Sequence, residues 1–117
     1  KKIAESLSYT GVLTVEFFLT KNDGLLVNEL APRFHNSGHL TIEAFNISQF
    51  TAHVMAVCNL ESKSIKKISN AEMYNILGHE ILDYKKKIFK KNEFFYDYQK
   101  KEPREGRKMG HITILKD

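Results

Sequence analysis

The fold of this chain is decided by the stretch VLTVEFFLTKNDGLLVNELAP, residues 12–32. Residues 12–20 and 25–30 are rich in the β-branched, aromatic and other apolar side chains that favour strands. Between them lies Lys-Asn-Asp-Gly, residues 21–24, a combination typical of turns. Pro32 lacks the backbone donor that further pairing needs, so it ends the second strand. The stretch therefore predicts an antiparallel β-hairpin.

Each predicted strand carries one acid, Glu16 or Glu29. If the loop is residues 21–24, opposing residues have numbers that add to 45, and Glu16 faces Glu29 directly. A loop of residues 23–24 makes the two acids diagonal neighbours on one face, whereas a three-residue loop places them on opposite faces. Like charges this close repel unless something positive lies between them, and Mg²⁺ binds carboxylate and phosphate oxygens together. The pair indicates either a magnesium site or a solvated hairpin face that carries two acids and no ligand.

The rest of the first half is predicted to be mainly helical. Residues 3–8 have the spacing of the end of a helix, and residues 48–59 keep apolar side chains at helical intervals. The polar residues 33–39, with one glycine, are expected to form a loop between the hairpin and this second helix.

The second half is predicted to contain shorter elements and shows no internal repeat of the first. Residues 61–64 resemble a connector, and after it the pattern predicts a strand, a helix and two further strands: residues 71–77, 79–91, 94–98 and 111–115. Basic residues gather in the predicted helix and in the loop before the last strand. We therefore predict an α+β fold with two domains, residues 1–60 and 61–117.

Composition limits the class of protein. The longest stretch without a formal charge, residues 44–60, contains too many polar side chains for a membrane span. A single cysteine, Cys58, cannot form an internal disulfide, which favours a reducing compartment such as the cytoplasm. The chain begins at Lys1 with neither Met nor an apolar signal segment, so we expect a fragment of a longer protein. A formal net charge of +4 is compatible with nucleic acid, an acidic partner or a phosphorylated metabolite.

Two separated motifs narrow the choice among these functions. GLLVNELAPRFHNSGH, residues 24–39, resembles the signature of 5-(carboxyamino)imidazole ribonucleotide synthase, an ATP-grasp family of purine biosynthesis. TIEA at residues 41–44 and SQF at residues 48–50 fit the same family, and EPREGRKMGHITIL, residues 102–115, is similar to its terminal motif. Residues 61–99 match only loosely. The order and specificity of the motifs make chance similarity improbable.

The resemblance implies an enzyme that joins ATP, bicarbonate and aminoimidazole ribonucleotide, by phosphorylating bicarbonate and transferring its carboxyl group to the amine. It also implies a fold in which the end of an ATP-grasp domain, with an antiparallel hairpin and helices, precedes a small β-rich C-terminal domain. The family is dimeric, so a homodimer is expected. We expect the chain alone to be inactive, because the remainder of the ATP site would lie before Lys1.

The resemblance assigns roles to individual residues. Metal phosphoryl-transfer sites need carboxylates beside the nucleotide, which makes Glu16 and Glu29 the Mg²⁺ ligands and Asn28 with Glu29 part of the ATP site. Asn28 points away from them if the strand is regular, and Ala31 stands where many ATP-grasp enzymes have an Asn, so the third ligand is open. Arg33 suits bicarbonate or its phosphorylated form, because guanidinium binds oxyanions in a fork. The residues expected to bind the ribonucleotide are His35, Asn36 and Ser37 at its heterocycle and ribose, and Arg107 and Lys108 at its phosphate.

Each assignment has a plainer alternative. For Arg33, Arg107 and Lys108 the alternative is a cationic side chain on a solvated loop, and His111 is expected to be structural. His35 and His39 are four residues apart, but a flexible glycine lies between them and no third ligand for a transition metal is evident. Other functions left open are another ATP-grasp ligase, a basic nucleic-acid-binding domain and a non-catalytic interaction domain. The sequence contains no groove-reading motif that would favour nucleic acid.

Overall fold

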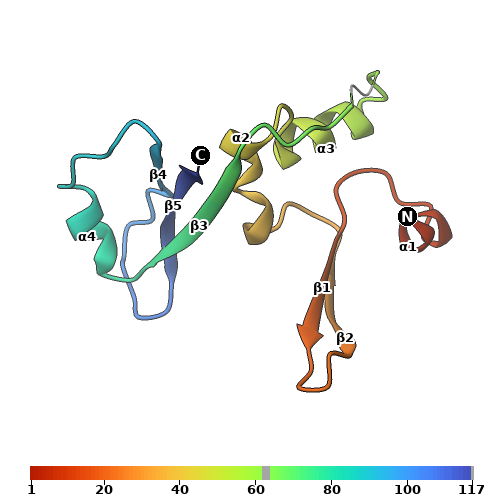
Figure 1. Ribbon diagram of the computed structural model, residues 1–117, viewed down its shortest axis with the longest axis horizontal. Helices are drawn as coiled ribbons and strands as arrows, with labels where there is room; N and C mark the ends of the chain where they lie inside the picture. The colour runs from red at the N-terminus through yellow and green to blue at the C-terminus, as the bar shows by residue number, and fades with distance from the viewer. Residues whose placement is uncertain (62–63, 117) are drawn as a thin grey trace. The chain divides into compact units, whose positions relative to one another are not determined.

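The computed structural model describes residues 1–61 and 64–116. The chain forms two compact units (Figure 1). The first comprises Lys1–His39 and Ile47–Ile65, and the second comprises Leu40–Asn46 and Lys66–Asp117. The short segment 40–46 thus interrupts the first unit and belongs to the second. Of the predicted connector, residues 62 and 63 lie outside the described part of the chain.

The first unit combines a hairpin with short helices, as the sequence predicts. Its elements in chain order are α1 (Lys2–Ser6), β1 (Thr14–Leu19), β2 (Leu25–Ala31), the 3₁₀ turn η1 (Asn36–Gly38) and α3 (Gln49–Val57). Strand β2 ends at the residue before Pro32, and α3 begins after Ser48, whose hydroxyl accepts a hydrogen bond from the N–H of Thr51.

The hairpin reaches the predicted register by a different route. Leu19 pairs with Leu25, which leaves residues 20–24 at the tip, one residue more than the predicted loop. A β-bulge then offsets this extra residue: Phe17 pairs with Val27, whereas Glu16 pairs with Glu29. The two acids therefore face each other, as the loop of residues 21–24 had predicted.

A small aromatic cluster joins the loop after β2 to α3. The ring of Phe34 lies 4.6 Å from that of Phe50 and 5.0 Å from that of His53, centroid to centroid. The imidazole of His53 also accepts a hydrogen bond from the N–H of Val12, at 3.1 Å. Helix α3 thus holds both the loop and the chain segment that leads into β1.

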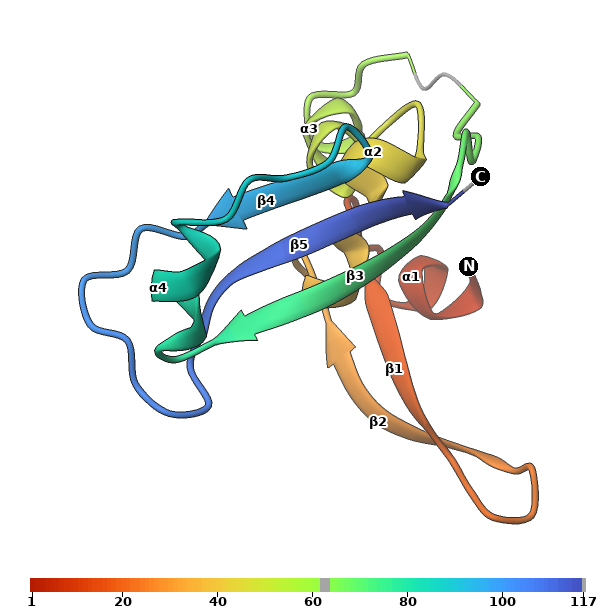
Figure 2. The ribbon, with the colours of Figure 1, turned by 60° about the vertical axis from the view of Figure 1, so that its left-hand side comes forward.

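The second unit is a three-stranded antiparallel sheet with two short helices (Figure 2). Its elements are α2 (Thr41–Ala44), β3 (Asn70–Leu77), α4 (Glu80–Tyr84), β4 (Glu93–Asp97) and β5 (Lys108–Lys116), and the strand order is β3-β5-β4. Strand β5 starts earlier than the predicted residues 111–115. Lys108 therefore lies in the strand and not in the loop before it.

The two faces of this sheet differ in chemistry. On one face, Ile76 and Ile112 pack with Ile81 of α4 and with Met109 in the buried apolar core. Alternate residues of β5 point to the opposite face, so His111 and Thr113 are buried there, although both are polar. The α2 segment contacts this second face, through the side chain of Glu43.

The helix predicted over residues 79–91 is wrong in its length, because α4 ends at Tyr84. Just beyond it the N–H groups of Lys86 and Lys87 donate to carbonyl oxygens three residues earlier, as in a turn. The segment also contacts β4: Lys85 Nζ pairs with Asp97 Oδ2 at 2.9 Å, and the ring of Phe89 stacks 5.1 Å from an aromatic ring of β4. Tertiary packing outweighs helical propensity in this basic segment.

Among residues 1–61 and 64–116, no helix is both long and apolar enough to cross a bilayer.

Candidate active site

Three side chains converge beside the middle of the hairpin. The Nε2 atom of His35 lies 3.3 Å from Glu16 Oε2 and 3.2 Å from Glu29 Oε1. The three candidate ligand atoms all lie within 4.8 Å of one another, and in the described chain they form a group that could hold a metal ion. The imidazole is 12% exposed, while the carboxylates are 42% and 45% exposed. A positive or N–H-bearing group therefore stands between the two acids, as their mutual repulsion requires.

Asn28 also joins this cluster, because it is the extra residue of the β-bulge. Its Nδ2 donates a hydrogen bond of 2.6 Å to Glu16 Oε1. The expectation that Asn28 points away from the acids applies to a regular strand, and β2 is irregular at this residue. A bulge redirects the side chain of its extra residue, which explains the difference. Ala31 is buried, and its methyl group offers no ligand atom.

The orientation of His35 follows from its neighbours. Its Nδ1 lies 2.7 Å from Ser37 Oγ and 3.3 Å from the Ser37 N–H, which donates to it. The hydrogen-bond network thus assigns the proton of the neutral ring to Nε2, the atom that faces both carboxylates. The backbone of His35 is held separately, by the amide of Gln49.

The donor set fits a hard divalent cation at this position. Two facing carboxylates supply anionic oxygens, which Mg²⁺ prefers, and the half-exposed setting leaves room for water or phosphate oxygens. His35 Nε2 is the third atom of this cluster, but in the tautomer assigned above it carries the proton and donates towards the carboxylates, so the carboxylate oxygens are the ligand atoms that remain. His39, by contrast, directs Nδ1 to Gln49, so His35 and His39 do not converge on a common ligand position.

The other predicted site residues of the first unit, Arg33, Asn36 and Ser37, lie in the same loop as His35. Arg33 is 62% exposed, with Nη2 3.9 Å from Glu29 Oε1 and Nη1 donating to the Phe34 carbonyl oxygen at 2.9 Å. Asn36 opens the 3₁₀ turn and is half-buried, whereas Ser37 is exposed. An exposed cation and several neutral donors therefore lie within a few residues of the carboxylate pair.

Arg107 and Lys108 belong to the second unit, where they end a tight turn and begin β5. The N–H of Gly78 donates to the Arg107 carbonyl oxygen at 2.8 Å, and Arg107 Nη1 donates to the Glu102 carbonyl oxygen at 2.9 Å. Lys100 Nζ donates to the Lys108 carbonyl oxygen at 2.6 Å. Backbone contacts fix this turn, while its cationic groups remain at the surface.

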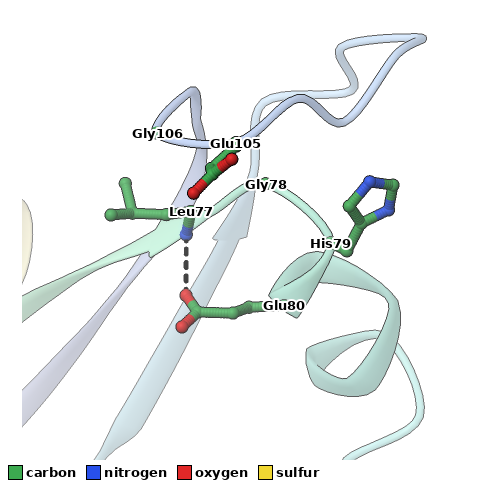
Figure 3. Close-up of a pocket in the computed structure, with 6 residues that line it drawn as sticks. All are labelled: Leu77, Gly78, His79, Glu80, Glu105 and Gly106. Atoms are coloured by element: carbon green, nitrogen blue, oxygen red, sulfur yellow. Dashed lines mark hydrogen bonds between the residues drawn. The ribbon is translucent and has the colours of Figure 1, made fainter.

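An open pocket of about 640 Å³ lies beside the same turn (Figure 3). It is lined by Leu77, Gly78, His79, Glu80, Glu105 and Gly106. Glu80 reaches back to accept the Leu77 N–H at 2.8 Å, and the ring of His79 points away from it. Two carboxylates in the lining disfavour a phosphate, so the pocket does not serve the chemistry expected of Arg107.

The sequence did not reveal a buried polar contact in the second unit. Tyr96 donates a short hydrogen bond from its hydroxyl to Oε1 of Glu43, a residue 53 positions earlier. Burial and then this hydrogen bond raise the pKa of Tyr96 to about 12. His111 stacks on Tyr96 with ring centroids 4.7 Å apart, and its Nδ1 lies 2.8 Å from the Tyr98 hydroxyl oxygen. His111 thus has the structural surroundings expected of it.

Comparison with known proteins agrees with these observations. The family model of the ATP-grasp domain matches residues 1–50, and that of the phosphoribosylaminoimidazole carboxylase C-terminal domain matches residues 71–117. The N5-carboxyaminoimidazole ribonucleotide synthase of Brucella melitensis is 44% identical over 99% of this chain, and that of Bacillus subtilis is 44% identical over 98%. The chain belongs to the N5-carboxyaminoimidazole ribonucleotide synthase family. The resemblance drawn from the two motifs is confirmed.

Solved structures of synthases in this family have the same fold. The Staphylococcus aureus synthetase complexed with ADP superposes with a TM-score of 0.86 at 40% identity, over 99% of this chain and 32% of that chain. The Aspergillus clavatus synthase in complex with ADP and 5-aminoimidazole ribonucleotide gives 0.80 at 35% identity, over 91% of this chain and 30% of that chain. The predicted α+β fold is therefore confirmed. The chain spans about a third of the length of the curated synthases it matches.

Proposed function

We propose that this chain acts as the C-terminal part of an ATP-dependent carboxylase that converts aminoimidazole ribonucleotide and bicarbonate to 5-(carboxyamino)imidazole ribonucleotide. The observation that carries the proposal is the direct opposition of Glu16 and Glu29, with His35 between them, in a chain of this synthase family. An Aspergillus clavatus relative has been solved with ADP and the ribonucleotide, which supports the choice of substrates. De novo purine biosynthesis is the corresponding pathway.

Glu16 and Glu29 hold Mg²⁺ in this proposal, with Asn28 and Glu29 beside the phosphates of ATP. When bound, the cation neutralises charge that develops on the transferred phosphoryl group. The amide of Asn28 fixes the orientation of the Glu16 carboxylate through its 2.6 Å hydrogen bond. Glu29 faces both the proposed metal position and Arg33, so it contacts the residues proposed for the nucleotide and for bicarbonate.

Arg33 binds bicarbonate and the carboxyphosphate formed from it. Transfer of the γ-phosphoryl group of ATP to a bicarbonate oxygen yields ADP and carboxyphosphate. The exocyclic amine of the ribonucleotide then attacks the carbonyl carbon, inorganic phosphate leaves with the electron pair of the broken C–O bond, and the nitrogen loses a proton. A guanidinium near the reacting carbonyl stabilises its developing negative oxygen.

The residues proposed to bind the ribonucleotide come from two parts of the sequence. His35, Asn36 and Ser37 face its heterocycle and ribose, while Arg107 and Lys108 bind its 5′-phosphate. We further propose a cytoplasmic homodimer that binds neither nucleic acid nor a membrane, with the division into domains at residues 1–60 and 61–117.

The proposal is tested on the full-length protein that contains this chain. Purified protein is mixed with ATP, Mg²⁺, bicarbonate and aminoimidazole ribonucleotide, and both ADP release and the carboxylated product are measured. We expect ADP release to require the ribonucleotide and the cation. No product under these conditions would reject the function, and ribonucleotide-dependent ATP hydrolysis by the 117 residues alone would reject the proposed division of the ATP site.

A further inference from the structure

The loop that carries His35 rests on one buried amide. Gln49, the first residue of α3, is only 7% exposed. Its Oε1 accepts the N–H of His35 at 3.0 Å, and its Nε2 donates to the carbonyl oxygen of the same residue at 2.9 Å. A single side chain thus binds both backbone polar groups of His35, as a neighbouring strand would.

The same amide reaches the far end of the loop. Gln49 Nε2 lies 2.9 Å from Nδ1 of His39, whose ring stacks on Phe50 with centroids 5.6 Å apart. Both hydrogens of the amide nitrogen are thereby directed at the loop, one to the His35 carbonyl oxygen and one to His39. The amide spans the residues between them, which include Asn36 and Ser37.

The close approach of the Gln49 amide explains why position 38 is a glycine. A Cβ atom at position 38 would lie 2.4 Å from Gln49 Oε1 and 2.7 Å from its Cδ, far inside normal contact distance. The obstacle is the amide itself, held in place by its hydrogen bonds to His35. Gly38 and Gln49 therefore form one packing unit beneath the loop.

We propose that Gln49 is a positioning residue for ribonucleotide binding. By fixing the backbone of His35, it sets the imidazole between Glu16 and Glu29 and holds the Asn36 and Ser37 turn in the shape that meets the substrate. Burial of an amide costs desolvation free energy unless every one of its hydrogen bonds is made. An apolar side chain of similar size would fill the same volume without this cost, so the hydrogen bonds of Gln49 to the loop are what distinguish it from such a side chain. The inference rests on the proposed function for its substrate, and on this geometry alone for the contact with His35.

The first experiment replaces the amide. Gln49→Met keeps the length and volume of the side chain but removes its hydrogen bonds. Exchange of the His35 amide hydrogen, followed in the full-length enzyme by mass spectrometry of short overlapping peptides, is expected to become about tenfold faster. In the full-length enzyme, KM for aminoimidazole ribonucleotide should rise about tenfold, while KM for ATP stays within about twofold. Gln99→Met is the matched control, because Gln99 is exposed and should change neither quantity.

The second experiment tests whether Gly38 and Gln49 act together. Gly38→Ala should raise the same KM by displacing the amide. In a Gln49→Ala background the added methyl group meets no amide, so Gly38→Ala should then have no further effect. Additive effects of the two substitutions would overturn the packing unit.

The outcomes separate this inference from the proposed function. Unchanged exchange at the His35 amide in Gln49→Met overturns the contact, whatever the enzyme does. Faster exchange with an unchanged ribonucleotide KM, or an equal rise in both KM values, overturns the positioning role. Absence of carboxylation by the unsubstituted enzyme overturns the proposed function, and the exchange measurement still decides whether Gln49 holds the loop.

Discussion

Asn28 donates its side-chain amide to Glu16 across the hairpin at 2.6 Å, because it is the one residue of β2 without a partner in the ladder. On either side of it, the pairs Phe17–Val27 and Glu16–Glu29 continue the hairpin. The bulge thus adds a polar side chain next to the two acids without moving either acid from its place opposite the other. In the proposed magnesium site, this amide orients a ligand without having to be one.

The role of Asn28 is separable from that of the bulge. Asn28→Ala removes the amide, and deletion of Asn28 also removes the bulge while leaving Glu29 opposite Glu16 in a straight ladder. Both changes should weaken Mn²⁺ binding, measured by electron paramagnetic resonance, by about tenfold. Asn22→Ala, at the hairpin tip, is the control. Normal binding in Asn28→Ala with lost binding in the deletion would assign the effect to backbone geometry.

Glu29 is expected to matter for the cation and not for the fold. Glu29→Gln removes one anionic ligand from an exposed position, so Mn²⁺ affinity and turnover should each fall at least about 100-fold. The free energy of unfolding should change by less than about 0.5 kcal/mol, because one of two repelling charges is lost at the surface. Glu5→Gln makes the same substitution at an exposed helix and should leave all three quantities unchanged. Turnover retained in Glu29→Gln would remove Glu29 from the site.

The sequence predicted the hairpin and its facing acids because both depend on local patterns. Strand composition, the turn residues and Pro32 are all read within about 20 positions. The orientation of Asn28 could not be predicted, because a longer tip and a compensating bulge give the same pairing of Glu16 with Glu29 as a shorter tip alone. Register can therefore be right while the side chain next to it faces the other way.

Contacts between distant residues could not be predicted from these patterns. The hydrogen bonds of Gln49 to His35 and of Tyr96 to Glu43 join segments that are far apart in the sequence. Periodicity within each segment carries no information about such contacts. Each involves a polar side chain buried by tertiary packing, and nothing in the local spacing distinguishes such a residue from a solvated one. The family motifs marked His35 as important but did not show what holds it.

The Tyr96–Glu43 contact should stabilise the second unit. Tyr96→Phe leaves a half-buried carboxylate without its donor, a change that typically costs about 1–3 kcal/mol. Tyr74→Phe is a matched control, because the Tyr74 hydroxyl donates to Glu72 at 2.6 Å at an exposed site, where the loss of stability should be smaller than in Tyr96→Phe. Urea unfolding of the unsubstituted protein and of the two variants measures the difference in the free energy of unfolding. Equal losses in the two variants would show that burial of the contact contributes nothing.

The same tyrosine should make stability depend on alkaline pH. Burial and the bond to Glu43 raise the pKa of Tyr96 from 10.0 to about 12, so the folded protein holds this proton more tightly than the unfolded chain. The resulting stabilisation is complete below pH 10 and is lost as the pH rises towards 12. Absorbance of phenolate should therefore show a late ionisation that is missing in Tyr96→Phe. An unchanged titration curve in the variant would contradict the shift.

Arg107 should affect binding of the ribonucleotide more than the chemical step. Its guanidinium extends over the Glu102 carbonyl oxygen, from which it can turn to a phosphate, and the proposed phosphate site is remote from the reacting amine. Arg107→Ala should raise KM for the ribonucleotide about 10- to 100-fold with kcat nearly unchanged, because the lost interaction is equally strong in the ground and transition states.

Arg104→Ala is the control in the same turn, since Arg104 is 72% exposed and pairs with the Glu102 carboxylate. Equal increases in KM in the two variants would mean that the turn contributes general positive charge, whereas an effect confined to Arg107 requires a defined contact. Steady-state kinetics at two salt concentrations distinguishes these, because general charge is screened and a bidentate contact is screened less.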